Sequence, residues 1–164
     1  REKLDRELKP YREEEARKKA EKERIEADFD KARAIFEESD LLRLAQELAA
    51  VVKGMTLSKS NENSIINNKY HIGLIWDQYE RTEKIDYYNK REYMGFKRVW
   101  ISCDANGTID IAGKYTRTLR LSEWKGNVAA QERALETAFT SPYKEDTNWI
   151  NHSEPPEHGG SYGL

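Results

Sequence analysis

The chain has 164 residues, of which 35% are charged, and its formal net charge is −2. Because both signs are interspersed, no field of the whole molecule draws it to nucleic acid or anionic lipid, and such binding would need a local patch. No apolar run reaches the roughly 20 residues of a membrane-spanning helix.

The first part of the chain predicts a long, highly charged helix. Residues 1–38 contain 12 Lys/Arg and 13 Asp/Glu. Residues 11–38 lack Gly and Pro and are dominated by the strong helix formers Glu, Lys, Arg and Ala, so we expect one helix there. Pro10 predicts that residues 1–9 form a separate turn or a kinked lead-in.

A spacing of four and three residues marks a coiled-coil-like seam along this helix, apolar at both ends and charged in the middle. A self-sufficient coiled coil would not place Glu15, Lys18 and Lys22 in its core. We expect instead an ion-paired helix whose 25–36 end packs on another surface. The candidate partner-binding residues of the seam are Leu4, Leu8, Tyr11, Ile25, Phe29 and Phe36.

A second helix is predicted over residues 40–53, with Ser39 or Asp40 as N-cap and Gly54 as its stop. Its apolar stripe is out of phase with the seam of the first helix, so we expect a break between the two. The stripe consists of Leu41, Leu44, Ala45, Leu48, Val51 and Val52. Residues 1–54 thus form a charged helical arm plus a second helix. Residues 55–69 are rich in Ser, Asn and Lys, which predicts a linker or long loop with Ile65 and Ile66 tucked against the domain.

After residue 69, apolar residues recur at every second position instead of at helical spacing. This pattern predicts strands over 70–76 and 96–103 and a shorter strand over 85–88. After Cys103, a three-residue loop places apolar residues opposite apolar ones, whereas a two-residue loop mixes them with polar residues. Asp104 and Gly107 suit such a loop, a type I turn closed by a G1 bulge. The resulting register pairs Trp100 with Ala112, Ile101 with Ile111, Ser102 with Asp110, and Cys103 with Ile109.

A Gly113-Lys114 turn would then return residues 115–121 as a third strand and pair Asp110 with Arg117. The first face of this sheet would carry Val99, Ile101, Cys103, Ile109, Ile111, Thr116 and Thr118. The second face would carry Arg98, Trp100, Ser102, Asp110, Tyr115 and Arg117. A helix between residues 122 and 141 has an apolar stripe that would cover the first face, and Pro142 would end it.

The predicted fold class is α+β: two N-terminal helices, the first long and highly charged, followed by a small antiparallel β-sheet backed by a C-terminal helix. We expect four or five strands, with the sheet and its helix forming a domain over residues 70–141. Residues 142–164 contain Pro-Pro and Gly-Gly and have no periodicity. They predict an irregular tail in which Trp149 is a further candidate for partner binding.

No phosphate-binding loop, zinc spacing or catalytic triad is present, so we expect no enzyme, no cofactor and no small-molecule substrate. His152, Glu154, Glu157 and His158 lie close in sequence, but their Pro- and Gly-rich setting disfavours a metal site. The lone Cys103 excludes an intramolecular disulfide and falls on the predicted core face. It fits an intracellular, reducing compartment, either the cytoplasm or an organelle matrix after presequence removal.

The favoured hypothesis is a non-enzymatic protein-interaction or structural component, such as an accessory subunit or an inhibitor within a larger macromolecular assembly. Extended elements at both ends of a small domain are natural where a partner supplies the missing surface. The alternative is a nucleic-acid-binding module that uses the second sheet face, although residues 95–125 carry a surplus of only three positive charges. Its candidate residues are Arg98, Trp100, Lys114, Tyr115 and Arg117.

Overall fold

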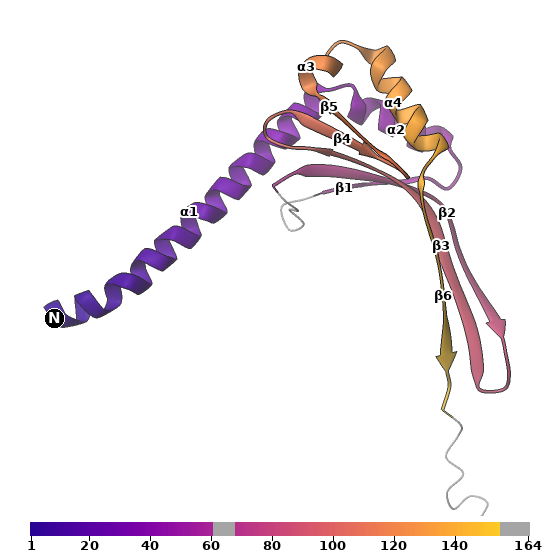
Figure 1. Cartoon of the computed structure of the whole chain (residues 1–164), viewed down its shortest axis with the longest axis horizontal. Helices are drawn as coiled ribbons and strands as arrows, with labels where there is room; N and C mark the ends of the chain where they lie inside the picture. The colour runs from indigo at the N-terminus through magenta and orange to yellow at the C-terminus, as the bar shows by residue number, and fades with distance from the viewer. Residues whose placement is uncertain (61–67, 155–164) are drawn as a thin grey trace, which may run out of the picture.

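The computed structural model describes residues 1–60 and 68–154 and has α+β architecture, as predicted (Figure 1). Two N-terminal helices precede an antiparallel sheet, and helices α3 and α4 come before its last strand. The elements in chain order are α1 (Glu2–Glu38), α2 (Leu41–Val51), β1 (Thr56–Lys59), β2 (Tyr70–Lys84), β3 (Asn89–Cys103), β4 (Thr108–Ala112), β5 (Thr116–Arg120), α3 (Leu121–Trp124), α4 (Val128–Thr140) and β6 (Tyr143–His152).

The sheet has six strands rather than the four or five expected, and the long strand β3 is its centre. Strands β1 to β5 are neighbours in chain order, and all pairs are antiparallel. Strand β6 pairs with residues 89–98 of β3, whereas β4 pairs with residues 100–103. Strands β4 and β6 therefore lie end to end along the same side of β3.

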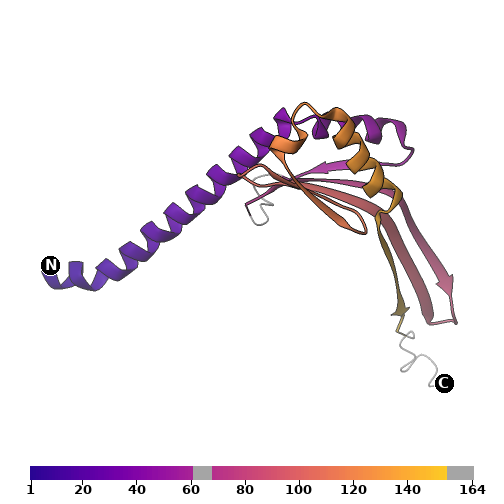
Figure 2. The same ribbon diagram turned by 45° about the horizontal axis from the view of Figure 1, so that its top comes forward.

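One face of the sheet is covered by α2, α3, α4 and the C-terminal part of α1 (Figures 1 and 2). The apolar alternation predicted from the sequence supplies the sheet half of this core. Ile72, Ile101 and Ile109 are fully buried, and the helices contribute Trp124 and Leu135. None of the helices in residues 1–60 and 68–154 covers the opposite side of the sheet, which we call the open face (Figure 1).

The hairpin between β3 and β4 has the predicted register. Ile101 pairs with Ile111, and Cys103 pairs with Ile109. The Asp104 carboxylate accepts hydrogen bonds from the backbone N–H of Asn106 and of Thr108, each at 2.9 Å. Gly107 has φ +83°, the left-handed conformation that the predicted bulge requires.

The predicted register between β4 and β5 is wrong by one residue. Asp110 pairs with Thr118, so Arg117 lies opposite Ile111, on the helix-covered side. Thr116 and Thr118, expected on the core side, lie on the open face. The register differs because a contact outside the turn fixes the loop. The Lys114 N–H donates to the Ser141 carbonyl at 2.7 Å, which holds a three-residue loop over 113–115 in place of the expected two-residue turn.

Part of the sheet projects from the body as a three-stranded ribbon, the β arm, made of residues 79–84, 89–95 and 146–152 (Figure 1). Two predictions are corrected here. Residues 85–88 form the turn of this ribbon and not a strand, and residues 143–152 of the expected irregular tail form β6. The carboxylate of Asp86 accepts from the N–H groups of Tyr88 and Asn89 and stabilises the turn.

Helix α1 is continuous from Glu2, so residues 1–9 are not a separate turn, although Pro10 lies inside the helix and its axis bends close to the N-terminus (Figure 1). Its 25–36 end packs on the body, as expected. The rings of Phe29 and Phe36 lie 5.8 and 5.4 Å from that of Tyr70, and both residues are fully buried. They belong to the chain's own core, so their side chains are already covered in the isolated chain.

The predicted linker contains strand β1, which pairs with residues 72–75 of β2. The predicted docking of Ile65 and Ile66 from the same segment lies outside the described residues. Helix α2 follows its predicted stripe, with Leu41, Leu44 and Ala45 buried. Val51 was expected in the same stripe, but 79% of its surface is exposed. Across residues 1–60 and 68–154, no helix combines the length and apolar character that crossing a bilayer requires.

Candidate interaction site

A cluster of aromatic side chains and one arginine occupies the open face where the body meets the β arm. Because side chains alternate along a strand, residues 96, 98 and 100 of β3 share this face. The register adds Tyr143 of β6 opposite Arg98, and His71 of β2 opposite Ser102. We call this cluster the aromatic patch; it consists of His71, Phe96, Arg98, Trp100 and Tyr143.

Arg98 is the centre of the patch. Its guanidinium carbon lies 4.6 Å from the centroid of the Tyr143 ring and 4.9 Å from that of Trp100. The Phe96 centroid is 5.9 Å away. Such cation–π contacts fix a long side chain that would otherwise lose rotamer entropy on binding. The patch is therefore an organised surface before any partner arrives.

Two donors of the patch have no acceptor among the described residues. The Nε atom of Arg98 and the Nε1 atom of Trp100 are shielded from solvent and make no hydrogen bond. A shielded donor without an acceptor costs about 1–3 kcal/mol. Both atoms are covered by the chain itself, so an acceptor brought by a ligand could reach them only if the patch rearranged.

His71 adds an uncharged ring to the patch. Its ring centroid lies 4.9 Å from that of Trp100. Burial lowers the pKa of His71 below its usual range, and a hydrogen bond to the Lys69 backbone opposes that effect only in part. At neutral pH the imidazole is therefore neutral, and Arg98 is the only charged member of the patch.

The surroundings of the patch mix both signs of charge. Asp110 lies on the same face, 3.6 Å from the ammonium group of Lys69, and accepts a hydrogen bond from Thr118. At the other end, the Tyr143 hydroxyl donates to Glu145, and this carboxylate raises the pKa of Tyr143. A binding surface with an aromatic centre and a mixed polar rim is typical of protein interfaces.

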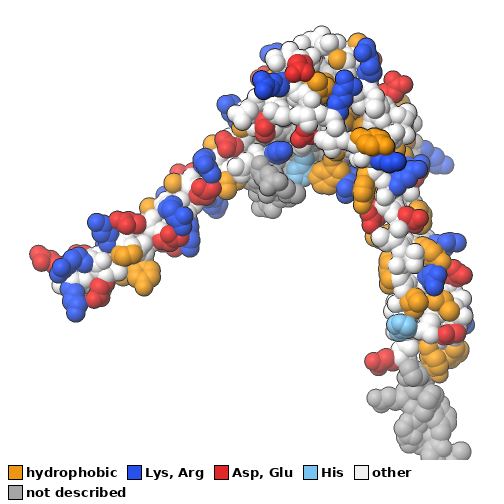
Figure 3. All heavy atoms as spheres, in the orientation of Figure 1, with side chains coloured by type: hydrophobic (Ala, Val, Ile, Leu, Met, Phe, Trp, Pro, Cys, Tyr) orange, Lys and Arg blue, Asp and Glu red, His pale blue; other side chains and the backbone are white. Residues whose placement is uncertain are grey.

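The β arm continues the open face away from the body and adds exposed apolar side chains. Met94 and Trp149 lie on the face that bears the patch, and 46% of the Trp149 surface is exposed. The other face holds Tyr93, which stacks on Arg81 at 4.2 Å and donates to Glu83 at 2.9 Å. Figure 3 shows hydrophobic and basic side chains together on the underside of the body, between α1 and the arm, and hydrophobic ones along the arm.

The structure separates the five residues predicted for nucleic-acid binding. Arg98 and Trp100 are neighbours in the patch. Lys114 and Tyr115 lie in the loop between β4 and β5, and Arg117 projects from the opposite side of the sheet. The five side chains therefore do not form one surface, because a register shift of one residue reverses the face of every side chain on β5.

The residues predicted to bind a protein partner also divide into groups. Leu4 and Tyr11 are 55% and 71% exposed near the free end of α1, and Leu8 between them is half-buried. Ile25 is half-buried at the edge of the body. Trp149 lies on the arm. Sequence reasoning missed His71, Phe96 and Tyr143, although the alternation of residues 96, 98 and 100 was a usable signal for Phe96.

Cys103 is buried on the core side, as predicted. It is fully inaccessible, and its Sγ donates to the Asp104 carbonyl at 3.3 Å. Burial, followed by the negative charge of Asp104, raises the pKa of Cys103 to about 12. The reactive thiolate is therefore almost absent at pH 8.

We expect iodoacetamide at pH 8 to leave Cys103 of the folded protein unmodified and to alkylate it rapidly in denaturant, as followed by mass spectrometry. The raised pKa means that the fold favours the neutral thiol of Cys103. The resulting contribution to the free energy of unfolding is fully present below the pKa of this thiol in the unfolded chain. It is lost as the pH rises from that value toward the pKa in the folded protein. Rapid alkylation without denaturant would contradict the burial of this residue.

The described residues include no cluster of three or more His, Cys, Asp or Glu side chains that could hold a metal. The candidates Glu157 and His158 lie outside residues 1–60 and 68–154. The chain matches no protein-family model, no curated protein and no solved structure. A functional proposal therefore depends on the geometry of the patch and the β arm.

Proposed function

We propose that the protein is a non-enzymatic interaction component of a larger assembly, in which the aromatic patch and the β arm hold a protein partner. The observation that carries this proposal is the arm itself. It is a ribbon that no described helix covers on either face, and Gly95 is the only buried residue in its described part. A ribbon of this kind gains little hydrophobic stabilisation alone, so a partner that covers it would supply the missing burial.

The exposed side chains of the arm support the same proposal. Trp149 and Ile150 are 46% and 44% exposed, and Tyr87 at the tip is 75% exposed. Strands β2 and β6 each have one edge in the arm that no described strand covers. Unpaired edges and exposed aromatic residues are features that proteins either cover or use for binding.

Charge favours a protein over a nucleic acid as the partner. Residues 79–95 and 146–152, the β arm with its turn, together contain four Lys/Arg and five Asp/Glu, so the arm has no positive field for phosphates. The patch offers one guanidinium group surrounded by aromatic rings. This is the composition of a protein-binding hot spot, in which Trp, Tyr and Arg are enriched.

The test is a pull-down from nuclease-treated extract of the native cells, with the full chain as bait. Replacing Arg98 by Glu reverses the charge inside the patch, and Trp149→Ser removes the largest exposed ring of the arm. We expect both variants to lose a protein that the wild-type chain retains. Since each change affects a central contact, the loss should be at least about tenfold.

Two matched controls make this experiment decisive. Arg117→Glu makes the same charge change on the opposite side of the sheet, and Tyr115→Ser removes an exposed ring from a loop outside the patch. Both controls should retain the partner. Equal retention by Arg98→Glu, Trp149→Ser and the wild type would exclude the patch and the arm as the binding surface.

A nucleic-acid-binding function is the second candidate, and one observation favours it. Arg98 stacked on Trp100 is a combination that also contacts bases and phosphates. Fluorescence anisotropy with labelled random-sequence RNA and duplex DNA at low salt separates the two candidates. A salt-sensitive complex that Arg98→Glu abolishes and Arg117→Glu preserves would favour nucleic acid. Absence of binding would favour protein.

A further inference from the structure

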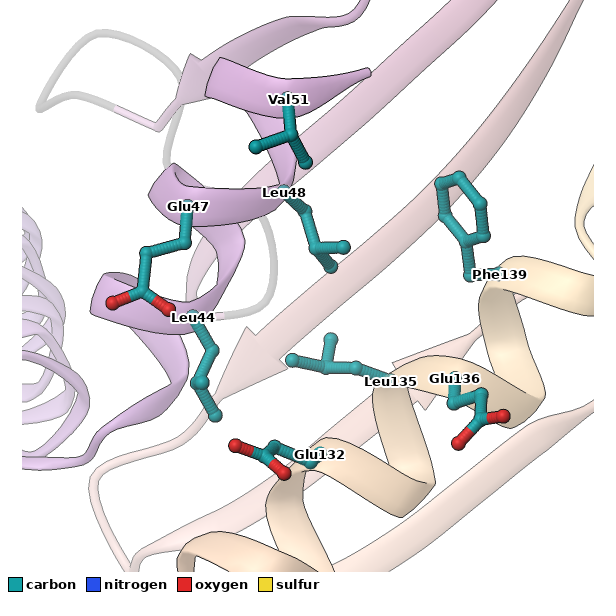
Figure 4. Close-up of a pocket in the computed structure, with 8 residues that line it drawn as sticks. All are labelled: Leu44, Glu47, Leu48, Val51, Glu132, Leu135, Glu136 and Phe139. Carbon is teal, nitrogen blue, oxygen red and sulfur yellow. The ribbon is translucent and has the colours of Figure 1, made fainter.

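An apolar groove lies between α2 and α4, on the side of the molecule opposite the open face (Figure 4). Its volume is about 440 Å³. Leu44, Leu48 and Val51 of α2 face Leu135 and Phe139 of α4 across it. Leu44 and Leu135 are buried and form its floor, whereas Val51 is 79% exposed at its rim. The groove is separate from the aromatic patch and is not used by the proposed function.

The rim of the groove is acidic. Glu47 comes from α2, and Glu132 and Glu136 come from α4. Glu47 pairs with Arg43 at 2.9 Å, but within the described residues neither Glu132 nor Glu136 forms an ion pair with a basic side chain. Among the described residues that line the groove there is no Lys or Arg. Its chemistry suits an amphipathic helix with apolar residues on one side and a net positive charge.

The N-terminal end of α1 has these properties. Leu4, Leu8 and Tyr11 follow one another at intervals of four and three, as do Leu44, Leu48 and Val51 in the groove. Such spacing places three side chains on one face of a helix. Residues 1–12 contain five Lys/Arg and three Asp/Glu, a net charge of +2. In its own molecule this end of the helix has nothing to pack on, since no residue before Phe29 is buried.

The groove of the same molecule cannot receive this segment. Figure 1 shows the N-terminus at the far end of α1, pointing away from α2 and α4. Residues 2–24 alone span about 35 Å at 1.5 Å per residue, and the C-terminal part of the helix is fixed to the body through Phe29 and Phe36. Only a second copy of the chain can bring its N-terminal helix to the groove.

We propose that the apolar stripe Leu4–Leu8–Tyr11 of one copy docks in the α2/α4 groove of a second copy. Leu4 and Tyr11, which are exposed in the isolated chain, become covered, and so does Val51. The acidic rim attracts the positively charged segment and excludes a groove-to-groove contact between copies. Because helix and groove are different surfaces, the contact is heterologous. Two copies could each place their helix in the groove of the other, or each copy could bind the next one in a series.

Sedimentation velocity of the full chain over a range of concentrations tests this docking. We expect wild-type protein to associate beyond the 19.2 kDa monomer. Val51→Glu places a charge beside three carboxylates in the groove, and the double variant Leu4→Glu/Leu8→Glu makes the helical stripe polar. Each should raise the dissociation constant about tenfold or more. All these changes are on exposed or half-exposed side chains, so circular dichroism should show an unchanged fold.

Mixing the two variants gives the sharpest readout. The Val51→Glu chain retains an intact helix, and the Leu4→Glu/Leu8→Glu chain retains an intact groove. Equal amounts should therefore form a one-to-one complex that neither variant forms alone. Tyr115→Glu, an equivalent change on a 70% exposed ring elsewhere, should associate like the wild type.

Four results would overturn the proposal. The wild type could stay monomeric at every concentration, which would leave the groove to a foreign basic helix. The variants could associate as well as the wild type, or their mixture could fail to form the complex. Loss of association in Tyr115→Glu would show a non-specific contact. None of these outcomes affects the patch, whose test uses Arg98→Glu and Trp149→Ser.

Discussion

Phe29→Asp is expected to release α1 from the body and to reduce the free energy of unfolding by more than the about 3–5 kcal/mol typical of Phe→Ala in a core. Phe29 is fully buried and packs on Tyr70. Asp leaves a cavity and also places a carboxylate in the core. Arg33 lies 5.7 Å from the Phe29 ring, but its side chain is 40% exposed and already pairs with Asp30, so it offsets this cost only in part. Urea denaturation followed by tryptophan fluorescence measures the loss.

The matched control is Leu4→Asp, which makes a comparable change near the other end of the same helix. Leu4 is 55% exposed, so its substitution should change the stability of the monomer by no more than about 0.5 kcal/mol. The measurement is made at a concentration where the protein is monomeric, because Leu4 also belongs to the proposed docking stripe. Equal effects at Phe29 and Leu4 would show that the helix is not anchored as described.

Gly95→Ala is expected to detach β6 from the β arm. Gly95 is buried between Tyr79 of β2 and Asp146 of β6. A methyl group on its α-carbon would lie 2.6 Å from the Glu145 carbonyl oxygen and still closer to the Tyr79 ring. The carbonyl belongs to the backbone of β6 and cannot rotate away, so the strand must move. Overpacking of this kind costs about 1–3 kcal/mol, and hydrogen exchange of residues 143–152 should accelerate.

Gly73→Ala provides the comparison on the same sheet. The added methyl group there would meet only the Ser58 hydroxyl oxygen, at 3.0 Å, and a hydroxyl can rotate away. We therefore expect unchanged hydrogen exchange in β6 and a small change in stability. Slow exchange of β6 in Gly95→Ala would contradict the close packing at the base of the arm.

The core was predictable because its signals are local and periodic. The alternation in residues 96–103 and the turn residues Asp104 and Gly107 were sufficient for the correct register of β3 and β4. The β arm has no such signal, since both of its faces are exposed and neither needs apolar side chains at every second position. Its third strand, β6, is defined by main-chain pairing with a segment far away in the sequence, as in the pairing of Asn89 with His152.

The candidate site was predictable only in part for the same reason. Arg98 and Trp100 lie on one strand, so their common face followed from the period of two. Tyr143 reaches them from a segment 45 residues away, through the pairing of β6 with β3. Arg117 was misplaced because the loop before β5 is held by Ser141, a contact outside the turn itself. Tertiary contacts therefore decided the parts of the site that local patterns could not.

The end-to-end arrangement of β4 and β6 along β3 has a consequence for the order in which the protein is assembled. The β2–β3 and β3–β4 hairpins join neighbouring segments, so they can form as soon as β4 has been synthesised. Until β6 follows, the long side of β3 over residues 89–98 has no partner within the described chain. During synthesis this side offers ten residues of open strand, to which another nascent chain or a chaperone could bind. The interval between the synthesis of β4 and β6, occupied by β5, α3 and α4, is therefore the period of greatest risk of mispairing.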